Sequence, residues 1–166
     1  MKTLILGLLF GLLCKFSFAQ NLPAFETIKL DVKEDYDSSA NSAALKASNY
    51  LLSTPFDNKN IDRLKSTQYL IKWMTGTPDY HFVLDEQAVK FAKKDDDLLV
   101  LYMAAMTKYV LENKKESTDQ NKIKLNATRS IITYAKDSKN NLKINSELKK
   151  MIEADEQGKL ESYLKI

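Results

Sequence analysis

Hydrophobic residues in this chain recur three or four positions apart, the spacing that places them on one face of an α-helix. The first such pattern runs from about Ser39 to Ser53, with Asp37 or Ser38 placed to cap its start and Pro55 after its end. Small side chains dominate this stripe, which predicts a close approach by another helix. Its members are Ala40, Ala43, Ala44, Ala47, Tyr50 and Leu51.

A second helix is expected to begin after Asn58 or Asn60 and to continue to Thr75. Gly76 stands where a left-handed residue commonly ends a helix, and Pro78 follows two positions later. We therefore expect the chain to turn here. The predicted buried side of this helix consists of Ile61, Leu64, Leu70, Ile71 and Met74, with Trp73 beside it.

The most apolar segment after the first twenty residues follows three consecutive aspartates, Asp95 to Asp97. Leu98 to Met106 are uninterrupted hydrophobic residues, and the pattern resumes at Tyr109 to Leu111. A helix that is apolar on nearly every side normally lies in the middle of a bundle. The apolar stretch is too short to span a membrane, which takes about 20 residues.

The rest of the chain predicts shorter or more polar helices. They are expected at Asp85–Lys93, after a Ser117-x-x-Gln120 capping box, and at Ser146–Gln157, with a last turn around Leu160 to Leu164. Loops are short enough to make neighbouring helices antiparallel. We predict an all-α fold, a compact bundle of five to seven antiparallel helices, with an array of helical hairpins as the alternative.

The N-terminal part divides into two segments before this single helical domain, 38–166. Residues 1–19 combine Lys2, an apolar run and the small residues Ser17 and Ala19, which predicts a signal peptide cleaved between Ala19 and Gln20. Residues 20–37 are expected to form an extended arm or a short strand. We therefore predict an exported protein, periplasmic or extracellular.

The amino-acid composition limits which ligands and reactions we expect for this protein. Cys14, the only cysteine, lies inside the predicted signal peptide, and His81 is the only histidine. We expect no metal site and no cofactor, since zinc needs several nitrogen or sulfur ligands. Arg63 and Arg129 are the only arginines among many lysines, so we predict no nucleic-acid binding. Of the three aspartates, one is expected to cap the helix and the others to interact with the positive end of its dipole. No catalytic set is recognisable, and we predict that the protein is not an enzyme.

The segment WMTGTPDYHF, residues 73–82, holds the chain's only tryptophan and its only histidine. Aromatic side chains of this kind dominate binding hot spots. They also commonly anchor a loop onto a core. Both interpretations are open, and under the first one the contact residues for a partner or ligand are Trp73, Asp79, Tyr80 and His81.

The signal ending in FAQ and the runs LIKWMTGTPDYHF and LLVLYMAAMTKYVLENK resemble a family of small secreted helical proteins of Bacteroidetes. The resemblance covers most of the chain after residue 19. It implies an exported helical domain and implies no activity.

The leading hypothesis is an exported, non-enzymatic helical protein that acts through protein–protein interaction. One alternative is a small apolar-ligand carrier with a pocket between helices, lined by Leu98 to Leu111 with Met103 and Met106 as an adaptable wall. Another is a hydrolase that uses paired carboxylates, which would require two or more acidic side chains to meet in a cleft.

Overall fold

The computed structural model describes residues 21–57, 59–93 and 95–166, and the all-α prediction is confirmed there, with no strand in these ranges. The predicted signal peptide, residues 1–19, lies outside the described residues. Short 3₁₀ turns at Phe25–Thr27 and Lys33–Asp35 shape the N-terminal arm. The helices are α1 (Ser38–Ser53), α2 (Ile61–Gly76), α3 (Glu86–Val89), α4 (Asp96–Glu112), α5 (Gln120–Lys136), α6 (Ser146–Glu156) and α7 (Leu160–Leu164).

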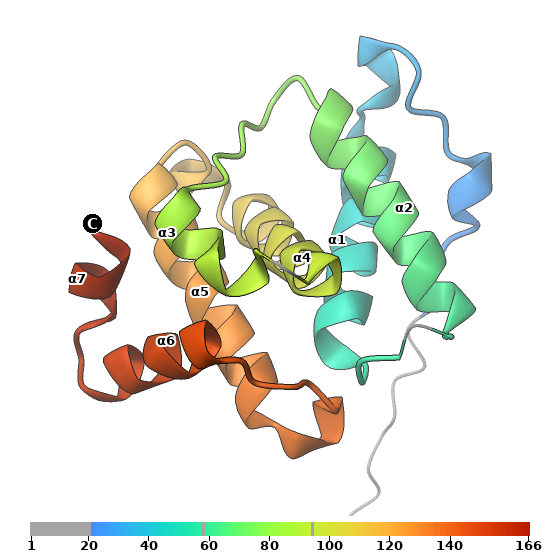
Figure 1. Ribbon diagram of the computed structural model, residues 1–166. Coiled ribbons are helices and arrows are strands. Elements are labelled where there is room, and N and C mark those ends of the chain that lie inside the picture. Colours follow the sequence, from blue (N-terminus) through green and yellow to red (C-terminus); the bar gives the residue numbers. More distant parts are fainter. Residues whose placement is uncertain (1–20, 58, 94) are drawn as a thin grey trace, which may run out of the picture.

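Helix α4 occupies the middle of the molecule, as its apolar sequence predicts. Figure 1 shows α1 and α2 on one side of it and α5, α6 and α7 on the other. Leu98, Leu101 and Tyr102 have no exposed surface, and Met106 is only 1% exposed. The apolar segment of α4 therefore packs the core between α1 and α5.

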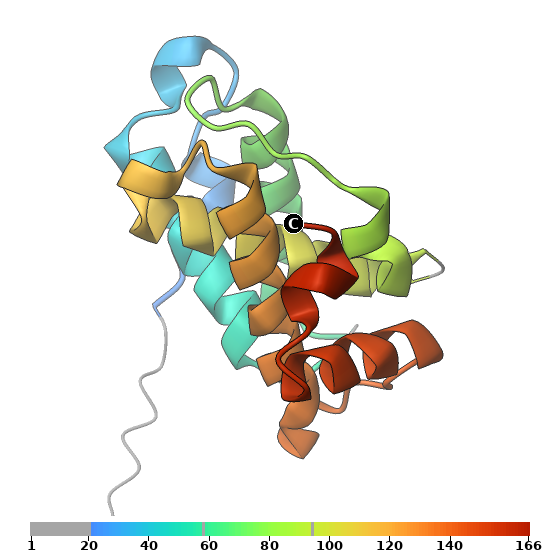
Figure 2. The ribbon, with the colours of Figure 1, turned by 90° about the vertical axis from the view of Figure 1, so that its left-hand side faces the viewer.

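Helix α1 fits against its neighbours through the predicted alanine stripe, whose four alanines and Leu51 are buried, while Tyr50 is half-buried. Ala40, Ala44 and Ala47 have no exposed surface at all. Because alanine adds so little bulk, the backbones of α2 and α4 can both approach α1. Figure 2, turned by 90°, shows α5 crossing in front of α4.

Side-chain caps begin the helices where the sequence supplies aspartate or asparagine. Asp37 accepts hydrogen bonds from the backbone N–H groups of Ser39 and Ala40 at 2.8 and 2.9 Å. Asn60, Asp85 and Asp95 cap α2, α3 and α4 in the same way. These caps agree with the sequence prediction.

The predicted capping box of the fifth helix is wrong. Asp119, not Ser117, accepts the hydrogen bond from Lys122 N–H at 3.1 Å and begins α5. The Ser117 hydroxyl instead donates to the carbonyl of Lys114 at 2.9 Å, inside a preceding 3₁₀ turn. An aspartate two positions later caps equally well, and the sequence pattern alone does not choose between them.

The predicted buried side of α2 is wrong at three positions. Ile61, Leu64 and Ile71 are 63%, 51% and 41% exposed. Leu70 and Trp73 are buried as predicted, but the helix is rotated so that Arg63, Ser66 and Tyr69 are buried with them.

Hydrogen bonds from these buried side chains to α1 explain the rotation. The Tyr69 hydroxyl donates to the carbonyl of Ala40 at 3.1 Å. The Trp73 indole N–H donates to Asn41 Oδ1, also at 3.1 Å. Both aromatic residues thus bury their rings and satisfy their polar atoms in the same contact.

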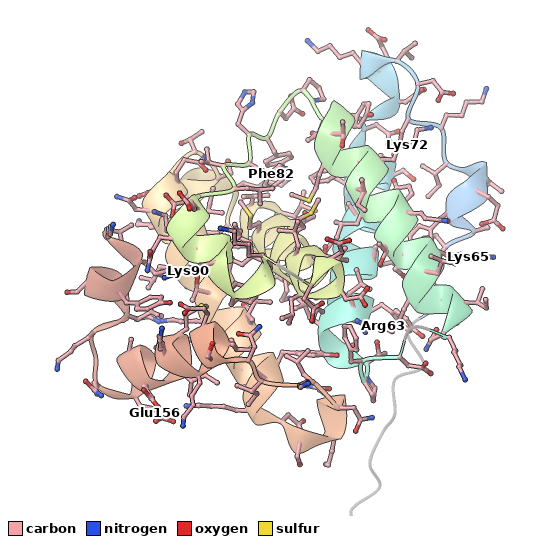
Figure 3. The ribbon with its side chains drawn as sticks, viewed as in Figure 1. Arg63, Lys65, Lys72, Phe82, Lys90 and Glu156 are labelled. Atoms are coloured by element: carbon pink, nitrogen blue, oxygen red, sulfur yellow. The ribbon has the colours of Figure 1, made fainter. Side chains whose placement is uncertain are left out.

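Arg63 ties α2 to the C-terminal end of α1, where these two helices meet in Figure 3. Its Nη1 donates to the carbonyls of Leu51 and Thr54, both at 3.0 Å, and to Thr54 Oγ1 at 2.8 Å. The guanidinium carbon lies 5.5 Å from the ring centre of Phe56. A buried cation therefore satisfies the last carbonyls of α1 at the negative end of its dipole.

Gly76 is required for a reason that the sequence did not predict. The residue is the last of α2 and does not adopt the expected left-handed conformation. A Cβ atom at this position would lie 1.7 Å from Tyr36 Oη and 2.6 Å from Tyr36 Cζ. The glycine thus makes room for Tyr36, which fastens the N-terminal arm against α2.

Replacing Arg63 by methionine keeps an apolar side chain and removes the guanidinium. We expect the free energy of unfolding to fall by about 2 kcal/mol, because buried carbonyls lose a charged donor. Urea unfolding followed by circular dichroism measures the change. The matched control is Arg129→Met, whose side chain is 51% exposed and should change stability by less than about 0.5 kcal/mol. Equal effects would contradict the capping role.

The contact between Gly76 and Tyr36 can be tested by a double-mutant cycle. Gly76→Ala should destabilise the protein by about 1 kcal/mol, because the new methyl group displaces the Tyr36 ring. In a Tyr36→Ala background the same change should be neutral or stabilising by about 0.5 kcal/mol, because alanine favours the helix. Thermal unfolding of all four proteins gives the coupling. Additive effects would show that the two residues do not meet.

Candidate functional site

The aromatic loop begins at the end of α2, and the structure resolves the role of Trp73. This residue has no exposed surface. Its ring centre lies 5.6 Å from that of Tyr80 and 6.1 Å from that of Phe82. The hypothesis that Trp73 contacts a partner is therefore corrected: its indole is a core residue onto which the loop packs. Figure 3 shows Phe82 on the inner side of the loop, facing the middle of the molecule.

The other predicted contact residues differ in exposure. Tyr80 is half-buried on Trp73, and burial, followed by the nearby Asp79 carboxylate, raises the pKa of its phenol. Asp79 and His81 are exposed. The backbone carbonyl of His81 accepts a hydrogen bond from Gln120 Nε2 at 3.1 Å, which ties the loop to α5. Of the four predicted contact residues, Asp79 and His81 are thus accessible to a partner, whereas Trp73 and Tyr80 anchor the loop to the core.

The outer face of α2 was missed by sequence reasoning. Ile61, Leu64 and Ile71, named here the α2 outer stripe, are exposed on the side of the helix turned away from α1. Figure 1 shows α2 at the edge of the molecule. Arg63, Tyr69 and Trp73 lie on one side of α2, a pattern that the sequence contains. Their hydrogen bonds to α1, which decide that this side is buried, are visible only in the structure.

A groove of about 630 Å³ lies between the C-terminal half of α4 and helix α5. Small residues, Ala105 and Ser130, are among its lining residues. Lys108 lies on its α4 side, donating to Glu112 and to Asn49 Oδ1, the latter at 2.8 Å. Lys108 and Glu112 of this groove therefore satisfy each other.

Tyr109 lines the same groove and donates its hydroxyl to Glu116, which also accepts from Lys122 Nζ at 2.6 Å. Partial burial, followed by the hydrogen bond to and the charge of Glu116, raises the pKa of the Tyr109 phenol to about 12. The hydrogen bonds from Lys122 and Tyr109 lower the pKa of Glu116. The phenol is thus held protonated and the carboxylate ionised.

Acidic residues do not assemble into an evident metal site. Asp95 caps α4 by accepting from Leu98 N–H at 3.1 Å, and Asp96 and Asp97 are exposed in its first turn. In the part of the chain that the structure describes, no three His, Cys, Asp or Glu side chains gather as metal ligands would. Two acidic residues, Asp57 and Asp97, line a hollow of about 110 Å³ beside Arg63, and a pair of this kind is what the carboxylate-hydrolase hypothesis requires.

Within the described ranges, none of the helices combines the length and apolar character that crossing a membrane requires. No protein-family model, curated protein or solved structure matches this chain. The surfaces described above therefore carry the functional argument.

Replacing Glu116 by glutamine should lower the pKa of Tyr109 from about 12, because the charge of Glu116 is lost, while burial and the charge of Asp119 still hold the pKa above that of a free phenol. NMR titration of a ¹³C-labelled tyrosine, assigned by Tyr109→Phe, measures this pKa. Stability conferred by the raised pKa is complete below pH 10 and is lost as pH rises toward 12. An unchanged Tyr109 pKa in Glu116→Gln would exclude the carboxylate as a cause.

Proposed function

We propose that this protein is exported and acts by binding another protein through the outer face of α2, without catalysing a reaction. The observation that carries the proposal is the α2 outer stripe, Ile61, Leu64 and Ile71, exposed along one side of a helix at the edge of the molecule. Apolar residues gathered on an exposed face favour an interaction site. Export is supported by the signal-like sequence of residues 1–19.

The spacing of the stripe favours a helical partner. Ile61, Leu64, Gln68, Ile71 and Thr75 follow alternating steps of three and four, the a and d positions of a coiled coil, and all five are exposed. Because α2 is already folded against α1, binding does not have to order it. An amphipathic helix laid along α2 would cover the aliphatic residues and face Gln68 at its centre.

The aromatic loop extends the proposed contact surface at the C-terminal end of α2. Asp79 and His81 are exposed there, and Tyr80 holds them in place by packing on Trp73. These polar residues would lie at the rim of the contact, where they select a partner more than they strengthen binding.

The packing of α4 favours the protein-interaction hypothesis over the small-ligand carrier. Met106 is buried and Met103 half-buried, among side chains that fill the core between α1 and α5. The interaction hypothesis needs no rearrangement of this core, and we therefore prefer it.

Site-directed photocrosslinking tests the proposal in the native host. A photoreactive residue at Gln68 should give a defined crosslinked partner, and the same residue at Lys149, on α6, should not. The double variant Leu64→Gln/Ile71→Gln should bind the purified partner at least tenfold more weakly, as expected for central apolar contacts.

The matched control is Ile144→Gln, since Ile144 is 44% exposed and lies in the loop before α6. This control should bind the partner like the unmodified protein. Thermal unfolding should change little in either variant, because the replaced side chains are surface residues. Equal binding by the double variant and the unmodified protein would refute the proposed surface.

A further inference from the structure

A hollow of about 500 Å³ lies between the N-terminal arm and α2. Its lining includes two aromatic rings, Phe25 and Tyr69, which are buried and stacked with their centres 4.8 Å apart. Ile28, half-buried, adds an aliphatic side chain. Because the Tyr69 hydroxyl is bound to the Ala40 carbonyl, its polar end is satisfied elsewhere and its ring contributes apolar surface. The hollow thus has an apolar floor.

Hydrogen-bond donors from α2 form one wall of this hollow. Lys65, Gln68 and Lys72 line it at steps of three and four residues, which spreads them over about 10 Å along the helix. In Figure 3, Lys65 and Lys72 lie on the side of α2 that faces the arm. A row of donors above an apolar floor suits a ligand with an apolar body and an anionic group.

Lys65 is the lysine best placed to bind an anion. Its one ion pair in the described chain is with Glu26, at 3.8 Å between two side chains that are 50% and 62% exposed. Such a pair contributes little and is easily exchanged. Lys72, in contrast, donates to Asp31 at 3.0 Å. Each lysine of the hollow thus faces one carboxylate, and the Lys65–Glu26 pair is the longer and looser of the two.

We propose that this hollow binds a free medium-chain monocarboxylate. The apolar chain would lie on Phe25, Ile28 and Tyr69, and the carboxylate would accept hydrogen bonds from Lys65 and Gln68. We favour a small molecule because the hollow is bounded by two segments of the same chain and has the volume of a small-molecule site. The inference does not require the proposed protein interaction, although Gln68 takes part in both surfaces.

Glu26 gives the proposal a distinctive consequence. Its carboxylate lines the hollow and competes with the ligand for Lys65. Removing its charge should therefore strengthen binding of an anion. A merely apolar surface would not respond in this way.

The experiment compares octanoate with octan-1-ol, which has the same chain length and no charge, on the processed chain. Isothermal titration calorimetry should give an affinity for octanoate at least fivefold higher. In NMR spectra, octanoate should shift the Ile28 methyl and Phe25 amide signals. Lys65→Met should weaken octanoate binding about fivefold, and Glu26→Gln should strengthen it. Lys149→Met, which removes a more exposed lysine charge on α6, should leave it unchanged.

Equal affinity for octanoate and octan-1-ol would overturn the proposal, as would an equal loss in Lys65→Met and Lys149→Met. A short peptide ending in leucine with a free carboxylate should bind more weakly than octanoate. Tighter binding by this peptide would instead assign the hollow to a protein terminus. Circular dichroism of each variant checks that the fold is retained, and octanoate binding is measured on the isolated protein, so it can succeed or fail whether or not a crosslinked partner is found.

Discussion

The burial of α4 constrains the whole structure. A helix that is apolar on nearly every side has to be covered on several sides, and α1 and α5 provide most of that cover. Small side chains make the close packing possible, with Ala44 and Ala47 on α1 and Ala127 on α5 fully buried. Once α4 is enclosed in this way, α2 needs to contact mainly α1 and is left at the edge. The exposed face of α2 is thus a consequence of how the core is completed.

The rotation of α2 is decided by which of two residue sets gains more from facing α1. Burying a whole tyrosine or tryptophan removes about 150–250 Å² of surface from water and contributes about 4–6 kcal/mol. An aliphatic side chain contributes about 1.5–3 kcal/mol, and those of the α2 outer stripe are already about half covered. The orientation that buries Tyr69 and Trp73 against α1 therefore has the lower free energy. The hydrogen bonds of Arg63 to the end of α1 add to the same preference.

Much of the fold could be predicted because local signals and tertiary packing agree. The α1 stripe, the caps at Asp37 and Asn60 and the central place of α4 all follow from patterns within single segments. The orientation of α2 could not be predicted, because it depends on hydrogen bonds to residues of α1 some thirty positions earlier in the chain. The role of Gly76 was missed for the same reason, since the side chain that excludes a Cβ atom belongs to Tyr36.

The candidate sites also divide into those formed within one segment, which the sequence predicts, and those formed by distant residues, which it does not. Sequence reasoning found the aromatic loop because its residues are contiguous, but it did not find the hollow, which requires Phe25 to meet Tyr69 across forty-odd residues. That hollow depends on how firmly the arm is held. Phe25 stacks on Tyr69, Leu30 is buried, and Tyr36 packs over Gly76.

Three separated contacts are enough to position a short segment, yet each is small beside the packing of α4. Because local opening costs less where fewer apolar contacts are made, the arm should open more readily than the core. A ligand seated between the arm and α2 would contact both walls and oppose this opening. Binding in the hollow would therefore be thermodynamically coupled to order in the arm, through the same residues that attach the arm to α2.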